Sequence, residues 1–231
     1  MAGWGAQDYT RAMLQADEHA GAQRMRRGPR RDTREAILEC AEELLQRRGY
    51  SGFAYQHIAV QLGIRNAAIH YHFPAKEDLG IALIRRYRER FDAWTAALPR
   101  AFDAWSRLQA YFGTYRSYLA RRDKDDDCRL CPGGALAAEF CALPEPMRLE
   151  ARLLMRDVQD WLRRTLEDGR RDGVLQFNGD VHDKAVEIGA ALQGGIQIAR
   201  IAGVERFAQL LDQLALELNP ERASAARGPL P

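Results

Sequence analysis

At 231 residues, the chain is long enough for a small domain and a larger one. Its 46% hydrophobic residues support a full core and its 29% charged residues a charged surface, while a net charge of only +2 excludes a strong general attraction to nucleic acid. No stretch approaches the roughly 20 apolar residues that span a bilayer, the N-terminus lacks the apolar core of a secretory signal, and four cysteines in this length favour a reducing compartment, so we expect a cytoplasmic protein with no membrane partner.

Positive charge gathers toward the N-terminus. Residues 1–28 have no sustained apolar period, and we expect a flexible basic tail there. Residues 22–75 hold nine arginines against five acidic residues, a local excess that is expected where phosphates bind. The segment 24–31 fits either a solvated linker or an arm that lies along phosphates or enters a minor groove. In the second case, Arg30 and Arg31 contact DNA.

The first predicted helix begins at a capping box. Asp32 is followed three residues later by Glu35, the spacing in which a cap and its partner carboxylate satisfy free backbone N–H groups. Thr33, beside them, is included among the expected DNA contacts. The helix runs to Arg48 and ends before a glycine. Its inner face consists of Ile37, Cys40, Ala41, Leu44 and Leu45, and Cys40 is most simply a small core residue.

Two short helices joined by a tight turn are predicted between residues 55 and 73. Ile58 and Leu62 mark the apolar face of the first helix, and Gly63 can adopt the left-handed conformation that ends it. Ile69 and Phe73 mark the inner face of the second. This pattern predicts a helix-turn-helix whose second helix enters a major groove. The expected DNA contacts on that helix are Arg65, Asn66, Ala67, His70, Tyr71 and His72.

A new helix follows at once, with Lys76, another expected DNA contact, in its first turn. Together, Ile58-Ala59, Gly63-Ile64 and the run IHYHFPAKEDL at 69–79 resemble the DNA-binding domain of tetracycline-repressor-type (TetR family) regulators over about residues 32–80. The resemblance implies an all-α fold: a three-helix helix-turn-helix domain at 29–78, then a larger helical effector-binding and dimerisation domain at 79–220. A loose tail would follow at 221–231.

This chain departs from the family pattern at several positions. Members often carry Ser or Thr where Ala54 stands, and the missing helix cap costs about 1 kcal/mol. They also often carry Ser at Arg65, Tyr at His70 and Ser at Ala75. The changes at Arg65 and His70 bear on which bases are preferred rather than on DNA binding itself.

Helical spacing continues from residue 79 to the C-terminus. It predicts a long helix ending near Pro99, another over 102–119, a short one over 133–143, a long one closing at Gly169 or Gly173, and one capped by Asp180; the charge run 121–127 predicts an exposed loop. Residues 188–199 contain no charge, and 204–218 carry a wide apolar stripe that includes Leu211. We expect these last two helices to form a four-helix dimer interface, as the family resemblance also implies.

The spacing of Cys128 and Cys131 is typical of a zinc site. A structural zinc site needs four ligands, however, and no further Cys or His follows at suitable spacing. No strand precedes the pair, as a thioredoxin-type dithiol would require. Two readings remain. Cys131 at the amino end of a short helix can be a reactive sensor thiol, and residues 131–148 resemble a TetR subgroup that senses reactive electrophiles or unsaturated compounds. Alternatively, these cysteines are packing residues.

Aromatic and amide side chains between the long helices either line an effector cavity or form the core, with the two amides pairing across a dimer. They are Trp94, Trp105, Phe112, Tyr115, Trp161, Gln193 and Gln197, to which Cys131 is added as an effector contact. The leading hypothesis is a homodimeric regulator, a repressor of a palindromic DNA operator released by a small molecule or by cysteine modification. The alternatives are a thiol redox protein using Cys128 and Cys131, or an effector-free DNA-architectural dimer. We expect no enzyme activity, metal or cofactor.

Overall fold

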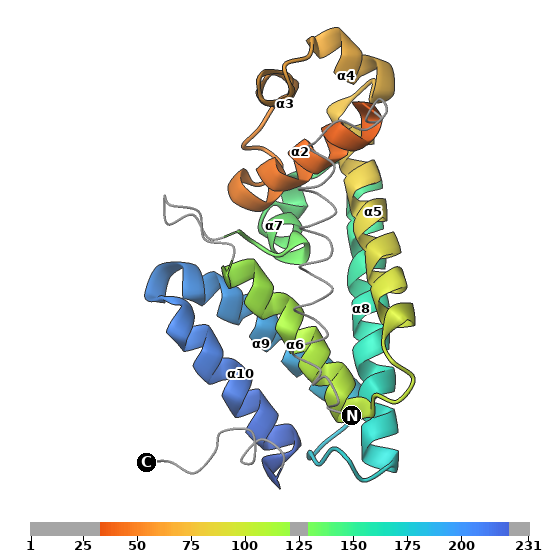
Figure 1. The fold of residues 1–231 in the computed structure, drawn as a ribbon, viewed down its shortest axis with the longest axis vertical. Helices are drawn as coiled ribbons and strands as arrows, with labels where there is room; N and C mark the ends of the chain where they lie inside the picture. Colours follow the sequence, from red (N-terminus) through yellow and green to blue (C-terminus); the bar gives the residue numbers. More distant parts are fainter. Residues whose placement is uncertain (1–32, 121–128, 222–231) are drawn as a thin grey trace, which may run out of the picture. The chain divides into compact units, whose positions relative to one another are not determined.

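The structure is a computed structural model that describes residues 33–120 and 129–221, apart from the side chains of 118–120. Over these two ranges the chain is helical and has no strand, which confirms the all-α expectation (Figure 1). None of these helices is long and apolar enough to cross a membrane. The basic tail, Arg30, Arg31, Cys128 and the predicted C-terminal tail beyond residue 221 lie outside the described residues. The elements are α2 (Thr33–Arg48), α3 (Tyr55–Leu62), α4 (Asn66–His72), α5 (Lys76–Ala97), α6 (Ala104–Ala120), α7 (Pro132–Ala138), η1 (Phe140–Ala142), α8 (Glu145–Arg171), α9 (Val181–Ala202) and α10 (Val204–Leu218).

The described residues form two compact units. The N-terminal unit consists of 33–96 and 129–157, and the C-terminal unit of 97–120 and 158–221, so α8 contributes to both. The chain therefore returns to its N-terminal helices after residue 129, and α7, η1 and the start of α8 pack with them. The domain boundary expected near residue 78 stays a prediction.

Apolar side chains at helical spacing hold the N-terminal unit together. Ile37 of α2, Ile58 of α3 and Ile69 of α4 are each fully buried in one core, which α5 extends through Leu79 and Leu83. Farther along, α5 and α8 run side by side (Figure 1). They are joined by ion pairs in which two arginines of α5 bind two acids of α8: Arg85 and Arg88 with Glu150 and Asp157.

The turn between α3 and α4 has the predicted form. Gly63 lies in the left-handed region, at φ 66° and ψ 31°. Because α3 closes there, the N–H of Ile64 donates to the carbonyl of Ala59 at 3.0 Å, a bond that satisfies one of the last free carbonyls of the helix. The turn thus sends α4 away from α3 with Ile69 facing inward.

The C-terminal unit differs from one sequence-based expectation. The apolar stripe of α10 was assigned to a dimer interface, but Phe207 and Leu211 are 1% and 0% exposed within the single chain. At Gly195 of α9, an added Cβ would lie 2.3 Å from Leu210 and 2.9 Å from Phe207, so α9 and α10 approach closely there. Leu211 therefore belongs to the core of its own protomer, because α10 turns its apolar face onto α9 and α6.

The short helix predicted over 133–143 is interrupted. α7 ends at Ala138, Glu139 takes φ −112° and ψ 11°, and a single turn of 3-10 helix follows. The interruption allows the Glu139 carboxylate to accept a hydrogen bond from the backbone N–H of Ser51 at 2.8 Å. The apolar spacing predicted one continuous helix here, because a local sequence pattern does not reveal a contact with a residue as distant in sequence as Ser51.

Candidate nucleic-acid interface

The outer face of α4 presents four of the expected DNA contacts together. Asn66, Ala67, His70 and Tyr71 are all exposed, with Tyr71 84% exposed. His70 follows Asn66 and Tyr71 follows Ala67 by four residues, so the two pairs lie on one side of the helix. Arg65 is exposed at the N-cap position. His72, at the flank, is half-buried, as is Thr33 at the start of α2. This grouping fits a recognition surface, while each contact with DNA stays a prediction.

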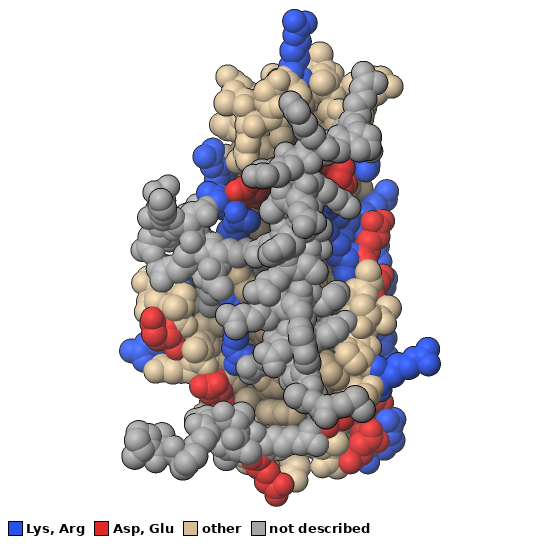
Figure 2. Space-filling model, viewed as in Figure 1, with Lys and Arg blue, Asp and Glu red and all other residues tan. Residues whose placement is uncertain are grey.

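The charge of this surface suits an anionic partner. Residues 55–72, which span α3 and α4, contain no acidic residue. On the face drawn in Figure 2, a basic side chain projects from the region of α3 and α4, whereas acidic side chains become visible over α2. A phosphate backbone approaching α4 would thus meet no nearby carboxylate from these two helices.

His70 is held in a defined orientation. Its Nδ1 lies 3.1 Å from the carbonyl oxygen of Pro74, and its ring meets the ring of Tyr55 edge-on, with centroids 4.8 Å apart. Tyr55 is itself fixed, because its hydroxyl donates to the Phe73 carbonyl at 2.8 Å. Burial, followed by the charge of Asp78, raises the pKa of Tyr55 to about 12, so this hydroxyl stays protonated and keeps donating.

A histidine supplies one of the two hydrogen bonds of a capping box at the start of α3. The Nδ1 of His57 accepts a hydrogen bond of 2.9 Å from the N–H of Ala54, the position where family members often have Ser or Thr. His57 stands where a capping box has Glu or Gln, so half of the box is preserved although the N-cap residue has no polar side chain. Sequence reasoning missed this role, although His at the third position after Ala54 was a visible signal.

Lys76 has a different environment from the one expected of a phosphate contact. Its Nζ donates to the carbonyls of Tyr50 and Phe53 at 2.6 and 2.5 Å and lies 4.3 and 4.5 Å from the centroids of their rings. Burial lowers the pKa of Lys76, an effect that the charge of Glu139 opposes. Because two of its three N–H donors bind the turn between α2 and α3, at most one is left for a phosphate.

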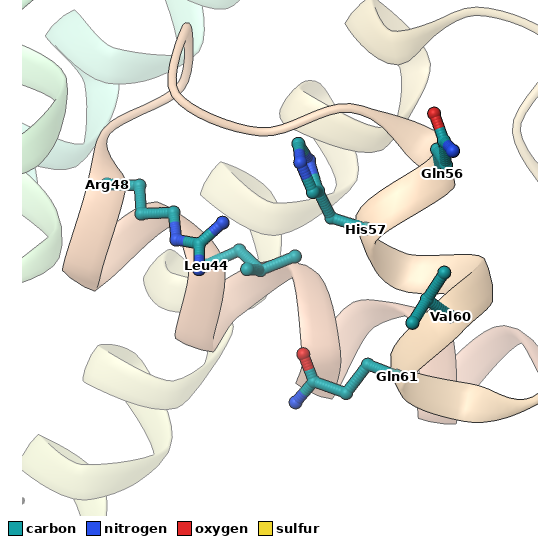
Figure 3. A pocket seen from close by; sticks show the side chains of 6 residues that line it. All are labelled: Leu44, Arg48, Gln56, His57, Val60 and Gln61. Carbon is teal, nitrogen blue, oxygen red and sulfur yellow. The ribbon is translucent and has the colours of Figure 1, made fainter.

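An open depression lies between α2 and α3 (Figure 3). Its volume is about 400 Å³, and Arg48 of α2 and Gln61 of α3 extend toward the space between the helices. It is open to solvent and lined by both polar and apolar side chains, including the exposed Val60, so it differs from the enclosed cavity in which a small effector is bound. The residues around it are Leu44, Arg48, Gln56, His57, Val60 and Gln61.

The segment 129–143 is fastened to α2 and to the turn that follows it. The N–H of Leu130 donates to the Gln46 carbonyl at 3.0 Å, and Arg129 pairs with Glu43 at 3.1 Å. Glu139 binds the N–H of Ser51, as described above. The segment is therefore bonded to α2 near its start and to the turn before α3 through Glu139, entirely within the N-terminal unit.

Cys131 lies in this segment and caps α7. Its side chain is 4% exposed, and its Sγ accepts a hydrogen bond from the N–H of Gly134 at 3.3 Å. Cys141, in η1, is exposed. Cys40 is buried, as predicted, and burial raises its pKa to about 11, so its thiol is protonated and unreactive at neutral pH.

The other expected effector contacts are divided between the two units. Trp94 stacks on Phe91 of the same helix, and α5 belongs to the N-terminal unit, as does Cys131. In the C-terminal unit, Phe112 is fully buried and Tyr115 is 6% exposed. The remaining side chains there are the buried Trp161 and the half-buried Trp105, Gln193 and Gln197.

A chain of polar groups crosses the aromatic part of the C-terminal unit. The Tyr115 hydroxyl lies 3.2 Å from that of Tyr111 and accepts a hydrogen bond of 3.2 Å from the Gln193 amide. The Tyr111 ring also packs on Trp161, with centroids 5.2 Å apart. Sequence reasoning missed Tyr111, although it precedes Tyr115 by one helical turn.

Two family descriptions match this chain. "Bacterial regulatory proteins, tetR family" matches residues 37–83, and "Tetracyclin repressor-like, C-terminal domain" matches residues 104–213. A TetR family regulator from Agrobacterium tumefaciens is similar in structure, with 34% identity and a TM-score of 0.74, over 80% of this chain and 97% of that one.

Two named regulators are also similar. The transcriptional repressor NemR of Escherichia coli is 27% identical over 178 residues, 71% of this chain and 85% of its own length. The crystal structure of its reduced form matches 81% of this chain and 97% of that one with a TM-score of 0.71. The regulator LmrA of Bacillus subtilis is 26% identical, over 74% of this chain and 88% of its own.

Proposed function

The chain belongs to the tetR family of bacterial transcriptional regulators, and from this premise we propose that it is a repressor whose operator is released through the segment 129–143. As a family member it binds operator DNA as a homodimer and responds to a small-molecule effector. We assign the operator contacts to the outer face of α4 and place the protein in the cytoplasm. Each protomer would read one half of a palindromic site.

The observation that carries the regulatory proposal is the attachment of the segment 129–143 to α2 and the following turn. Bonds from Leu130, Arg129 and Glu139 join them. A displacement of this segment would therefore change the position of α2 and the entry to α3. An effector can release DNA only if it favours one of two such arrangements, and about 3 kcal/mol of preference gives roughly a hundredfold change in affinity.

Modification of Cys131 is the first candidate trigger. Its thiol caps α7 and is buried within the N-terminal unit, so an added group would not fit without moving α7. The solved relative NemR has been crystallised in a form described as reduced, which supports a response to thiol chemistry in this part of the family.

A reversible ligand in the C-terminal unit is the second candidate. The hydroxyls of Tyr111 and Tyr115 and the amide of Gln193 form a hydrogen-bonded chain in an otherwise apolar aromatic layer. A few polar groups among aromatic side chains are typical of a small-molecule site. In this case Trp161 would stack on the ligand.

We assign dimer formation to α9. Its exposed positions include Val186, Ala190, Gly194 and Ile198, which recur every four residues and form an apolar line along the helix. A Cβ at Gly194 would meet no atom of the other described helices within 4 Å, so this line is open to a second copy. The apolar face of α10 is already buried in the protomer.

Selection of duplexes from a randomised pool, followed by treatment with p-benzoquinone, tests the proposal. The full chain should enrich a palindromic sequence, and the quinone should release it. Failure to enrich any sequence would contradict the operator-binding role, whereas enrichment without release would move the trigger from thiol chemistry to a reversible ligand.

A further inference from the structure

We infer that His70 selects a base by its chemical class, preferring an amino-bearing base when neutral and a keto-bearing base when protonated. The inference rests on the proposed role of α4 and concerns a residue where this chain departs from the family pattern. It is carried by the contacts that fix the His70 ring.

The hydrogen bond to Pro74 determines which nitrogen of His70 carries the proton. A carbonyl oxygen accepts hydrogen bonds and cannot donate them, so the Nδ1 that lies 3.1 Å from the Pro74 oxygen must be the N–H. In the neutral ring, Nε2 is consequently the unprotonated nitrogen. His57 has the opposite tautomer, because its Nδ1 accepts from the N–H of Ala54.

The same contacts leave Nε2 available to a partner. The His70 side chain is exposed, and Nε2 makes no hydrogen bond to any residue within 33–120 and 129–221. Tyr55 fixes the ring edge-on, at 4.8 Å between centroids. Asn66 and Tyr71 share the outer face of α4 with it. A helix inserted in a major groove along this face therefore presents an acceptor with a fixed direction.

An acceptor at this position distinguishes bases by the groups that they present in the major groove. Adenine and cytosine present an amino group in the major groove, whereas thymine and guanine present a carbonyl oxygen. Neutral His70 can accept from the amino group but would place a lone pair against a carbonyl. Protonation converts Nε2 into a donor and reverses the preference, while Nδ1 keeps its bond to Pro74.

The groups around His70 are two tyrosines, an aspartate and two further histidines. Tyr55 packs against the ring from α3, and its raised pKa keeps it neutral. Asp78 of α5 acts on Tyr55 and accepts from the Ala75 N–H at 2.9 Å. Tyr71 and His72 neighbour His70 on α4 and contact each other. His57 and His72 are the same in every variant of the comparison below, so a difference between variants is due to residue 70.

The test is duplex selection with the full chain at two pH values: about pH 8, which favours the neutral ring, and about pH 5.5, which favours the protonated ring. One position in each half-site should change from A or C to G or T on the contacted strand. The expected preference at that position is about tenfold in each direction, roughly the effect of one good contact. His70→Phe should lose the preference at both pH values. His70→Gln should keep a preference that no longer depends on pH.

The exposed His182 of α9 supplies the matched control, since it lies in the other unit, and His182→Gln should keep the complete pH-dependent change. Enrichment of the same base at both pH values by the wild-type chain would overturn the inference. So would an unchanged preference in His70→Phe, with its fold checked by circular dichroism. If the wild-type chain enriches no sequence at either pH, the operator-binding role fails and this inference fails with it.

Discussion

The carboxylate of Glu139 accepts a hydrogen bond of 2.8 Å from the backbone N–H of Ser51, a residue 88 positions earlier in the chain. On the same turn, Gly49 has a φ of 75° and no side chain, and Glu139 fills the space beside it. A Cβ on Gly49 would lie 2.0 Å from the Glu139 carboxylate oxygen. Lys76 binds two carbonyls of this turn, at Tyr50 and Phe53. The turn before α3 is thus held by two charged side chains: the Glu139 carboxylate binds a backbone N–H, and the Lys76 ammonium binds two backbone carbonyls.

Removal of the Glu139 carboxylate should loosen this turn. In Glu139→Ala, amide hydrogen exchange at Ser51 should become faster, and the free energy of unfolding should fall by about 1 kcal/mol. This is less than is usual for a hydrogen bond to a charged group, because Ser51 is exposed and Glu139 is half-buried. Glu145→Ala is the matched control, since Glu145 is exposed and pairs with nearby arginines. Equal Ser51 exchange in wild type and Glu139→Ala would remove the link between α7 and the turn.

Lys76→Ala should weaken DNA binding through the turn rather than through a lost phosphate contact. Its ammonium binds two backbone carbonyls, and losing it leaves both without that partner. We expect lower affinity for all sequences with an unchanged dependence of affinity on salt. A direct phosphate contact would instead reduce the salt slope by about one unit. Binding titrations at several salt concentrations distinguish the two roles.

Much of the fold followed from local patterns. The bounds of α2 and α10, the left-handed Gly63, the buried Ile58 and Ile69, and the Asp180 cap, which accepts from the His182 N–H at 2.7 Å, are as predicted. Each depends on spacing or on a single turn residue, and both are visible in one sequence. The sequence does not show which surface an apolar face packs against. The apolar stripe of α10 would have the same pattern whether it packed on a partner subunit or on its own protomer.

The site was less predictable for a related reason. The outward residues of α4 follow from its period, because the buried Ile69 fixes the opposite face. The roles of Lys76, His57 and Glu139 depend instead on backbone groups of other segments. Residue types and spacing do not specify these partners, so the sequence indicated Lys76 as a DNA contact but not its two bonds to backbone carbonyls.

Asn66 and Arg65 should affect DNA binding in different ways. Asn66 is exposed on the outer face of α4, and an Asn amide can make two hydrogen bonds to adenine, so Asn66→Ala should lower affinity by about 1–3 kcal/mol only for duplexes with the preferred base. Arg65→Ala should weaken binding to all sequences and reduce the salt slope. Uniform weakening by Asn66→Ala, seen in titrations with single-base variants of the selected duplex, would count against base reading.

A pair of substitutions locates the dimer interface. Ile198 of α9 is 57% exposed in the single chain, whereas Leu211 of α10 is fully buried. Ile198→Glu should yield folded monomers, because the charge is buried only when two copies associate. Leu211→Glu should unfold the protomer, since it buries a charge in the core at a cost on the order of several kcal/mol. Sedimentation and circular dichroism distinguish these results, and an intact dimer of Ile198→Glu would place the interface away from this face.

The three described cysteines offer different reactivity to an electrophile. Cys40 should stay unmodified, because burial raises its pKa to about 11. Cys141 is exposed and should react, but it binds none of the groups that join the segment 129–143 to α2. Cys131 is buried and caps α7, so its modification needs a transient opening of the segment. Adduct formation and DNA release can therefore be assigned to different residues.

Release should follow the adduct at Cys131. Cys131→Ser keeps an acceptor at the N-cap of α7, where serine is among the best residues, so this variant should bind the selected duplex like the wild type. It should then retain the duplex at a dose of p-benzoquinone that lowers wild-type affinity about a hundredfold, equivalent to roughly 3 kcal/mol. Cys141→Ser should respond like the wild type. Mass spectrometry at each dose should show the bound fraction falling as Cys131 is modified, and release of DNA from Cys131→Ser at the wild-type dose would leave Cys131 as a packing residue.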